Sequence, residues 1–173
     1  CARYDTHLLA YGTVCGGFLS GKWLGKPAPE DIPDWSKMKY MRFIESAGGW
    51  DAYQQILGTA SRIAEKHAVS LTNVASRWVL EQDRVAGVII GVRPGENDHR
   101  GDNAKLFGFT LDEADHQALN TAFAVTSEIP GDCGDEYRRP PFLTASGDLS
   151  HPPRQMPSAH DTDPLPPRDR HTA

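Results

Sequence analysis

Two segments of this sequence combine glycines with a cation directly after an apolar run, and this is the chemistry needed to hold a phosphate group. In residues 8–22, LLAYGTVCGGFLSGK, the apolar run leads into a turn that contains Gly12, Gly16 and Gly17 and is followed by Lys22. Glycine lets the backbone approach a ligand closely, exposed N–H groups can then point at phosphate oxygens, and lysine adds a positive charge. The segment therefore predicts a phosphate-binding loop.

A second segment of the same kind lies about seventy residues further on. The apolar run VAGVII (85–90) leads into GVRPGENDHRGDN (91–103), which contains Gly91, Arg93, Gly95 and the pair His99 and Arg100. Either segment alone is equally consistent with an ordinary glycine turn. Together, the two favour a bound cofactor.

The elements that would position these loops follow from apolar spacing. A helix is predicted over 51–67, with Asp51 as its cap, and a second one after Ser70, where apolar residues recur at helical spacing from Leu71 to Val79. TLDE at 110–113 reads as a capping box before a helix over 111–124. Strands are predicted at 8–12 and 85–90, and segment 26–50 reads as a surface excursion with one short helix.

Strands that alternate with helices favour parallel pairing in an α/β fold. A parallel sheet is normally covered on both faces, so two strands require neighbours that this sequence does not supply. The chain also begins with Cys1 rather than methionine. We therefore expect an incomplete part of a larger α/β domain, from a fragment or a truncated reading frame.

Composition divides the chain and excludes several classes of protein. Nine of the thirteen prolines lie in 127–173, which predicts a largely irregular tail after a domain over 1–126. A net charge of −5 without a dense basic cluster argues against nucleic-acid binding. The three cysteines show no metal-ligand spacing, and no apolar stretch approaches the roughly 20 residues of a membrane span. These features predict a cytoplasmic protein that binds no metal ion and does not cross a membrane.

The sequence resembles the C-terminal part of an aldo-keto reductase, in the subgroup similar to aryl-alcohol dehydrogenases. The resemblance rests on residues 8–25 (LLAYGTVCGGFLSGKWLG), on 64–103 (AEKHAVSLTNVASRWVLEQDRVAGVIIGVRPGENDHRGDN), and on FGFTLDEAD and GDCGDEYRRPPFLTASGDLSH after them. It covers nearly the whole chain. It implies the last strands and helices of a TIM (β/α)8 barrel, NADP(H) as cofactor, and a parent enzyme that reduces aldehydes or ketones to alcohols.

By position, the resemblance also assigns cofactor-binding roles. The Tyr11 ring would lie against the nicotinamide, residues 12–17 and Lys22 would meet the diphosphate, and Arg93 would bind the 2′-phosphate that distinguishes NADP. The second loop would also contact the adenine. The assigned residues are Tyr11, Gly12, Thr13, Val14, Cys15, Gly16, Gly17, Lys22, Gly91, Arg93, His99, Asp102 and Asn103. The alternatives are a merely packing role for Tyr11 and a solvated surface position for Lys22 and His99.

The catalytic residues of the family precede this chain, so no catalytic residue is assigned and the isolated chain is expected to be inactive. An alternative is a non-catalytic fragment or interaction module. A weaker one is a degenerate P-loop, GGFLSGK at 16–22, in which Trp23 replaces the hydroxyl residue that would hold Mg²⁺. Because the isolated chain lacks the neighbouring strands of the barrel, it is expected to associate or aggregate.

Overall fold

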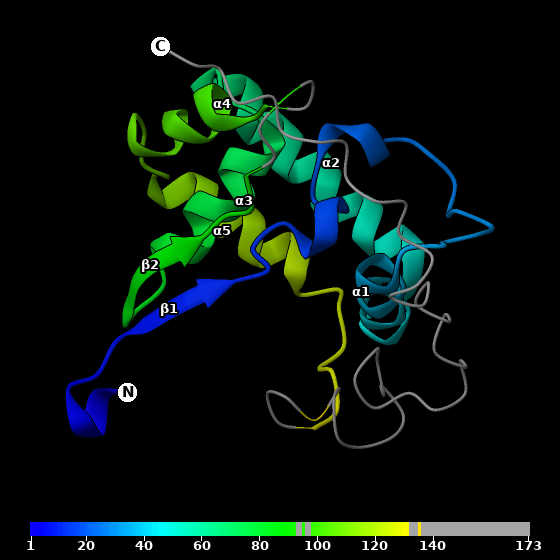
Figure 1. The fold of residues 1–173 in the computed structure, drawn as a ribbon, viewed down its shortest axis with the longest axis horizontal. Coiled ribbons are helices and arrows are strands. Elements are labelled where there is room, and N and C mark those ends of the chain that lie inside the picture. Colours follow the sequence, from blue (N-terminus) through cyan, green and yellow to red (C-terminus); the bar gives the residue numbers. More distant parts are fainter. Residues whose placement is uncertain (93–94, 96–97, 132–134, 136–173) are drawn as a thin grey trace, which may run out of the picture.

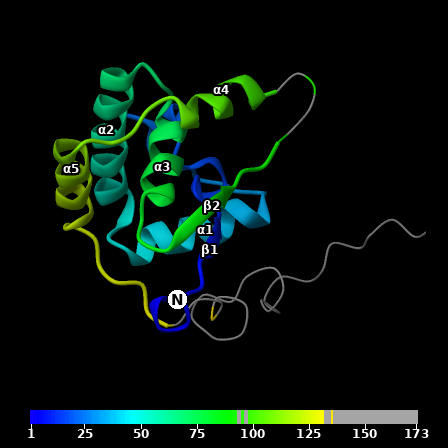
Figure 2. The same ribbon diagram turned by 90° about the vertical axis from the view of Figure 1, so that its left-hand side faces the viewer.

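The computed structural model describes residues 1–92, 95, 98–131 and 135 of the 173 residues, so Arg93 and the proline-rich tail lie outside its description. It contains two strands, β1 (Leu8–Tyr11) and β2 (Val85–Ile89), and helices gathered on one side of them (Figures 1 and 2). The α-helices are α1 (Trp35–Ser46), α2 (Gly49–His67), α3 (Leu71–Leu80), α4 (Arg100–Ala104) and α5 (Glu113–Phe123). Short 3₁₀ turns are η1 (Ala2–Tyr4), η2 (Cys15–Gly17), η3 (Gly21–Trp23) and η4 (Lys105–Phe107).

The two strands pair in parallel, which confirms the pairing predicted from the order of the elements. Leu9 lies opposite Gly87, and Tyr11 lies opposite Ile89. Each strand ends one residue earlier than the sequence predicted. Since both strands run in the same direction, the loops that follow them leave the sheet at the same edge.

The core forms where the apolar stripes of α2 and α3 meet. Leu57 of α2 and Val74 of α3 are fully buried, together with Phe18 from the turn after β1. The helix α5 joins this core through Leu119, and its last residue, Phe123, stacks on Trp78 with ring centroids 5.1 Å apart. The apolar stripes of α2 and α3 are the ones predicted from spacing, and their burial holds the helices together.

Two predicted helix starts were wrong. The helix α2 begins at Gly49 after Gly48, whose φ of 132° favours glycine, so Asp51 lies in the first turn instead of at the cap. The helix α5 is capped by Asp112, which forms a reciprocal capping box with Asp115, and not by the predicted Thr110. Leu111 explains the shift, because its side chain is buried and its N–H donates to Glu81, which keeps it outside the helix.

The excursion contains a longer helix than expected. The 12 residues of α1 begin after Asp34, whose carboxylate accepts a hydrogen bond from the Lys37 N–H at 2.9 Å.

In contrast to the helices, the strands are poorly covered. Leu8, Leu9, Tyr11 and Ile89 each keep half or more of their surface exposed.

Candidate functional site

The parallel register brings the two glycine loops to one edge of the sheet. Because Tyr11 and Ile89 are opposite each other at the ends of their strands, the turn that begins at Gly12 and the loop that leads to Gly91 start side by side. We call residues 12–17 the glycine turn and residues 91–103 the second loop. In α/β folds, ligands bind at this edge, beyond the carboxyl ends of the strands.

The backbone of the glycine turn is tightly coiled. Positive φ angles occur at Gly12 (70°), Cys15 (49°), Gly16 (63°) and Gly17 (94°). The Cys15 N–H donates to the Gly12 carbonyl, and the Gly17 N–H donates to the Val14 carbonyl, both at 2.9 Å. Among the described residues, the N–H groups of Val14 and Gly16 have no acceptor. A turn with such backbone donors can bind an anion.

The helix α1 reaches back to this turn through Tyr40. A Cβ atom at Gly12 would overlap the Tyr40 hydroxyl group, so the close approach of α1 depends on glycine at this position. Tyr40 belongs to segment 26–50, which was predicted as a surface excursion, and its contact with Gly12 was not predicted from the sequence. In the sequence, only the aromatic residues and the helical spacing in 26–50 indicate that this segment packs against the rest of the chain.

Two side chains of the turn, Thr13 and Cys15, pack into the protein. Thr13 is buried, and its hydroxyl lies 3.0 Å from the hydroxyl of Ser76 on α3. Burial raises the pKa of the Cys15 thiol to about 11, although the positive charge of Lys39 acts in the opposite direction. The thiol is therefore mainly protonated at neutral pH, and only its small ionised fraction would react as a nucleophile, so it should react slowly.

An aromatic cluster holds the segment after the turn. The ring of Phe18 packs against Trp23, Trp50 and Tyr53 with centroid distances of 5.1 to 6.2 Å. The Tyr53 hydroxyl donates to the Phe18 carbonyl, and the Trp50 indole N–H donates to the Lys26 carbonyl at 2.8 Å. These contacts fix the chain on the amino-terminal part of α2 and so limit the movement of the turn.

The outermost assigned residues are accessible to a ligand. Tyr11 keeps 63% of its surface exposed at the end of β1, and His99 and Gly91 are exposed in the second loop. Lys22 is exposed too, with its ammonium group 5.2 Å from the centre of the Trp23 ring. The geometry is compatible with cofactor contacts and equally with the alternative of solvated or packing residues.

Asp102 connects the second loop to the beginning of α3. Its carboxylate accepts hydrogen bonds from the Ser70 hydroxyl at 2.6 Å and from the Asn73 side-chain amide at 3.2 Å. The Asn73 amide also donates to the Asp102 carbonyl at 3.1 Å. Asn103, beside it, is half-buried. This network was not predicted from the sequence, where its sign is the polar Asn73 beside the apolar residues Leu71 and Val74.

Arg100 pairs within its own loop. Its guanidinium group donates to both carboxylate oxygens of Asp98, at 2.6 to 3.0 Å. This pairing lowers the pKa of Asp98, chiefly through the side-chain hydrogen bond. If the second loop met the adenine at Arg100, the guanidinium group would have to contact Asp98 and the ligand at the same time.

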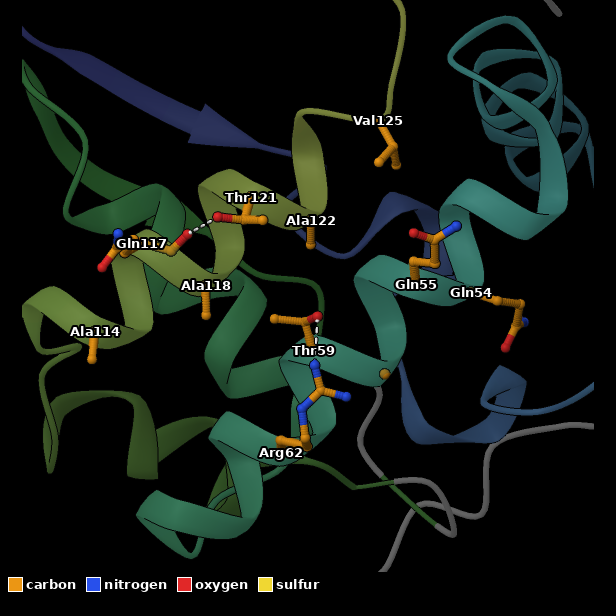
Figure 3. Close-up of a pocket in the computed structure, with 11 residues that line it drawn as sticks. Gln54, Gln55, Thr59, Arg62, Ala114, Gln117, Ala118, Thr121, Ala122 and Val125 are labelled. Atoms are coloured by element: carbon orange, nitrogen blue, oxygen red, sulfur yellow. Dashed lines mark hydrogen bonds between the residues drawn. The ribbon is translucent and has the colours of Figure 1, made fainter.

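A hollow lies away from both loops, between α2 and α5, and we call it the α2–α5 groove (Figure 3). Its volume is about 880 Å³, and small residues such as Ala118 and Ala122 of α5 face Thr59 and Arg62 of α2 across it. None of the assigned cofactor residues that the structure describes lines it. In the described part of the chain, no group of three or more His, Cys, Asp or Glu residues could hold a metal ion, and no helix is long and apolar enough to cross a membrane.

Comparison with known proteins identifies related chains. The model of the Aldo/keto reductase family matches residues 1–123. Flagellar radial spoke protein 5 of Chlamydomonas reinhardtii is 34% identical over 85 residues, which are 47% of this chain and 16% of that protein. Aldo-keto reductase YhdN of Bacillus subtilis (strain 168) is 24% identical over 140 residues, which are 77% of this chain and 38% of that protein.

A solved structure shows a similar fold. The glycerol dehydrogenase AKR11B4 from Gluconobacter oxydans superposes with a TM-score of 0.55 and 23% sequence identity, over 76% of this chain and 38% of that one. The chain therefore spans 16% and 38% of the lengths of the two curated relatives, and 38% of the solved chain.

Proposed function

The chain belongs to the aldo/keto reductase family, and from this premise we propose that it is the NADP(H)-binding, carboxyl-terminal part of a reductase. The parent enzyme would reduce an aldehyde or a ketone to an alcohol in the cytoplasm, with NADPH as the source of the hydride. Residues 1–126 would form the last strands and helices of its TIM barrel, and 127–173 would follow as a tail. The proposal accounts for a chain that spans 38% of a reductase relative.

The observation that carries this proposal is the shared position of the glycine turn and the second loop at one edge of the sheet. The turn offers backbone N–H groups at Val14 and Gly16, and the exposed Tyr11 ring lies directly before it. Such a donor set fits the diphosphate and the nicotinamide of a dinucleotide. Gly91 leaves room for close approach, because no atom lies within 4 Å of where its Cβ would be.

In this proposal the residues of this chain bind and orient the cofactor. The glycine turn would hold the diphosphate with Lys22 nearby, and Arg93 would bind the 2′-phosphate through its guanidinium group. His99, Asp102 and Asn103 would contact the adenine end. Since Asp102 is already bonded to Ser70 and Asn73, it would act by fixing the loop on α3 as well as by touching the base. The proton donor would come from the rest of the parent enzyme.

A second candidate is a non-catalytic interaction module. One relative is described as a flagellar radial spoke protein, and 34% identity over 85 residues links it to this chain. The strands of this chain also expose Leu9 and Ile89, which a partner could cover. In that case the glycine turn and the second loop would have a structural role and would bind no cofactor.

Titration of the full 173-residue chain with NADPH, followed by fluorescence, tests the proposal. We expect saturable binding that is tighter than that of NADH, and an Arg93→Ala variant should lose this preference. Removing one charged contact to a phosphate should cost about 1.5–3 kcal/mol, or roughly ten- to hundredfold in affinity.

Arg62→Ala is the matched control, because Arg62 is an exposed arginine in the α2–α5 groove and should leave NADPH binding unchanged. Equal binding of NADPH and NADH, or equal effects of the two substitutions, would contradict the NADP(H) site. A folded chain that binds neither nucleotide would favour the interaction module.

A further inference from the structure

A second, smaller hollow lies between α1, the amino-terminal part of α2 and the chain that follows α5, and we call it the apolar pocket. Its volume is about 440 Å³, within the range of roughly 300–1,000 Å³ that is typical of small-molecule sites. The pocket is lined by Tyr40, Phe43 and Ile44 of α1, by Tyr53 and Ile56 of α2, and by Cys15 of the glycine turn, with Phe123 and Ile129 among the rest.

The lining excludes a charged ligand. None of the described residues that surround the pocket is Asp, Glu, Lys, Arg or His. A charge moved from water into such surroundings without a partner would cost several kcal/mol. The part of an occupant that lies inside the pocket should therefore be uncharged.

The few polar groups at the pocket are occupied or weak. The Tyr53 hydroxyl donates to the Phe18 carbonyl, and the Thr126 hydroxyl donates to the Phe123 carbonyl. The Cys15 thiol is protonated at neutral pH and is only a weak donor. Of the other hydroxyl residues that line the pocket, Tyr40 places its hydroxyl beside Gly12, and Ser127 is exposed to solvent. Binding would therefore depend chiefly on burying hydrocarbon surface.

The size of the pocket limits the size of the occupant. A dry cavity of about 150 Å³ is enough for one benzene molecule. A volume of about 440 Å³ therefore accommodates two or three rings. The aromatic side chains of Tyr40, Phe43 and Tyr53 provide faces and edges against which such rings can pack.

From this lining and volume we propose that the apolar pocket binds an uncharged, mainly hydrocarbon small molecule of two or three rings. The site adjoins the glycine turn, because Cys15 lines it, but neither Tyr11 nor Lys22 does, and the proposal does not depend on NADP(H) binding. Of the residues of the glycine turn, Cys15 alone lines the pocket, and this contact gives a reporter for its occupancy.

The test uses the full chain with Cys1→Ser and Cys133→Ser, so that Cys15 is its one thiol, and the neutral fluorescent probe N-phenyl-1-naphthylamine. We expect saturable binding with increased fluorescence. At a probe concentration ten times Kd, alkylation of Cys15 by N-ethylmaleimide should slow about tenfold, because only the unoccupied fraction reacts. Intact mass measured over time follows the alkylation.

Ser127→Trp is the blocking variant, because Ser127 is exposed at the pocket and its backbone N–H, which donates to Ala47, is retained. The indole should fill part of the volume and weaken probe binding about tenfold. Thr121→Trp is the matched control, since it adds the same ring at an exposed position in the α2–α5 groove. Circular dichroism checks that each variant is folded, and Ile129→Trp replaces Ser127→Trp if the latter is not.

Probe binding that leaves the alkylation rate of Cys15 unchanged would overturn the proposal, because the probe would then bind elsewhere, for example on the exposed strands. Equal weakening by Ser127→Trp and Thr121→Trp would overturn it as well. Protection of Cys15 that is lost in the blocking variant alone would establish the site.

Discussion

At the scale of single residues, Gly12 is subject to two separate constraints. Its φ of 70° lies in the left-handed region, and a Cβ atom there would overlap the Tyr40 hydroxyl. We expect Gly12→Ala to lower the free energy of unfolding by about 1–3 kcal/mol, from backbone strain and the displaced tyrosine. Urea denaturation of both proteins measures the difference.

Gly21→Ala is the control for this prediction. Gly21 is not among the residues with positive φ, and no atom lies within 4 Å of where its Cβ would be. Its replacement should change the free energy of unfolding by less than about 0.5 kcal/mol. Equal effects at the two glycines would show that the contact between Tyr40 and Gly12 does not stabilise the fold.

Asp115 makes stability depend on pH. Burial disfavours its charged form, but hydrogen bonds from Lys66 and His67 outweigh this effect and lower its pKa to about 2. In the unfolded chain a carboxyl of this type titrates near about 3.9. Below pH 4 the unfolded chain therefore takes up a proton that the folded protein does not, so up to about 2 kcal/mol of stability is lost between roughly pH 5 and pH 2.

An Asp115→Asn variant tests this source of pH dependence. Asparagine removes the charge that Lys66 and His67 contact at 2.7 to 2.8 Å, so the variant should be less stable at pH 7. Its stability should then fall less between pH 5 and pH 3 than that of the unchanged chain. Urea unfolding at both pH values gives the two differences, and parallel pH profiles would contradict the assignment.

At the scale of elements, the contact between the second loop and α3 depends on one shared carboxylate. The Ser70 hydroxyl and the Asn73 amide both reach Asp102. A double-mutant cycle with Ser70→Ala and Asp102→Ala should give a coupling energy of about 1–2 kcal/mol, because a hydrogen bond to a charged group is lost. Urea denaturation of the four proteins gives this value. A coupling near zero would mean that α3 is capped without help from the loop.

The same elements show how much the sequence could predict. Apolar spacing predicted α2 and α3, because periodicity reflects which face is buried. A capping box predicted α5, and the alternation of elements predicted the parallel strands. The cap of α5 was wrong because Thr110 and Asp112 are both good capping residues, and the burial of Leu111 decides between them. The contact of Tyr40 with Gly12 and the bonds of Asn73 with Asp102 join distant parts of the chain, and local patterns carry no information on such pairs.

At the scale of the whole molecule, one face of the strands has no cover among the described residues. Leu9 is 67% exposed and Ile89 is 58% exposed, although parallel strands are normally buried on both faces. In the proposed parent enzyme, further strands would pack here. A chain without them should bury these side chains by associating with other copies.

Sedimentation velocity of the chain and of a Leu9→Lys variant tests this last expectation. The unchanged chain should form dimers or larger species as its concentration rises, whereas lysine at position 9 should shift the population toward monomer, because a charge on the apolar face disfavours contact. Phe107→Lys is the matched control, since Phe107 is 78% exposed in η4, outside the strands. If association requires the strand face, Phe107→Lys should leave it unchanged. A monomeric chain with a sharp thermal transition would instead show that two strands and five α-helices are stable without a partner, and the case for an incomplete barrel would lose its physical support.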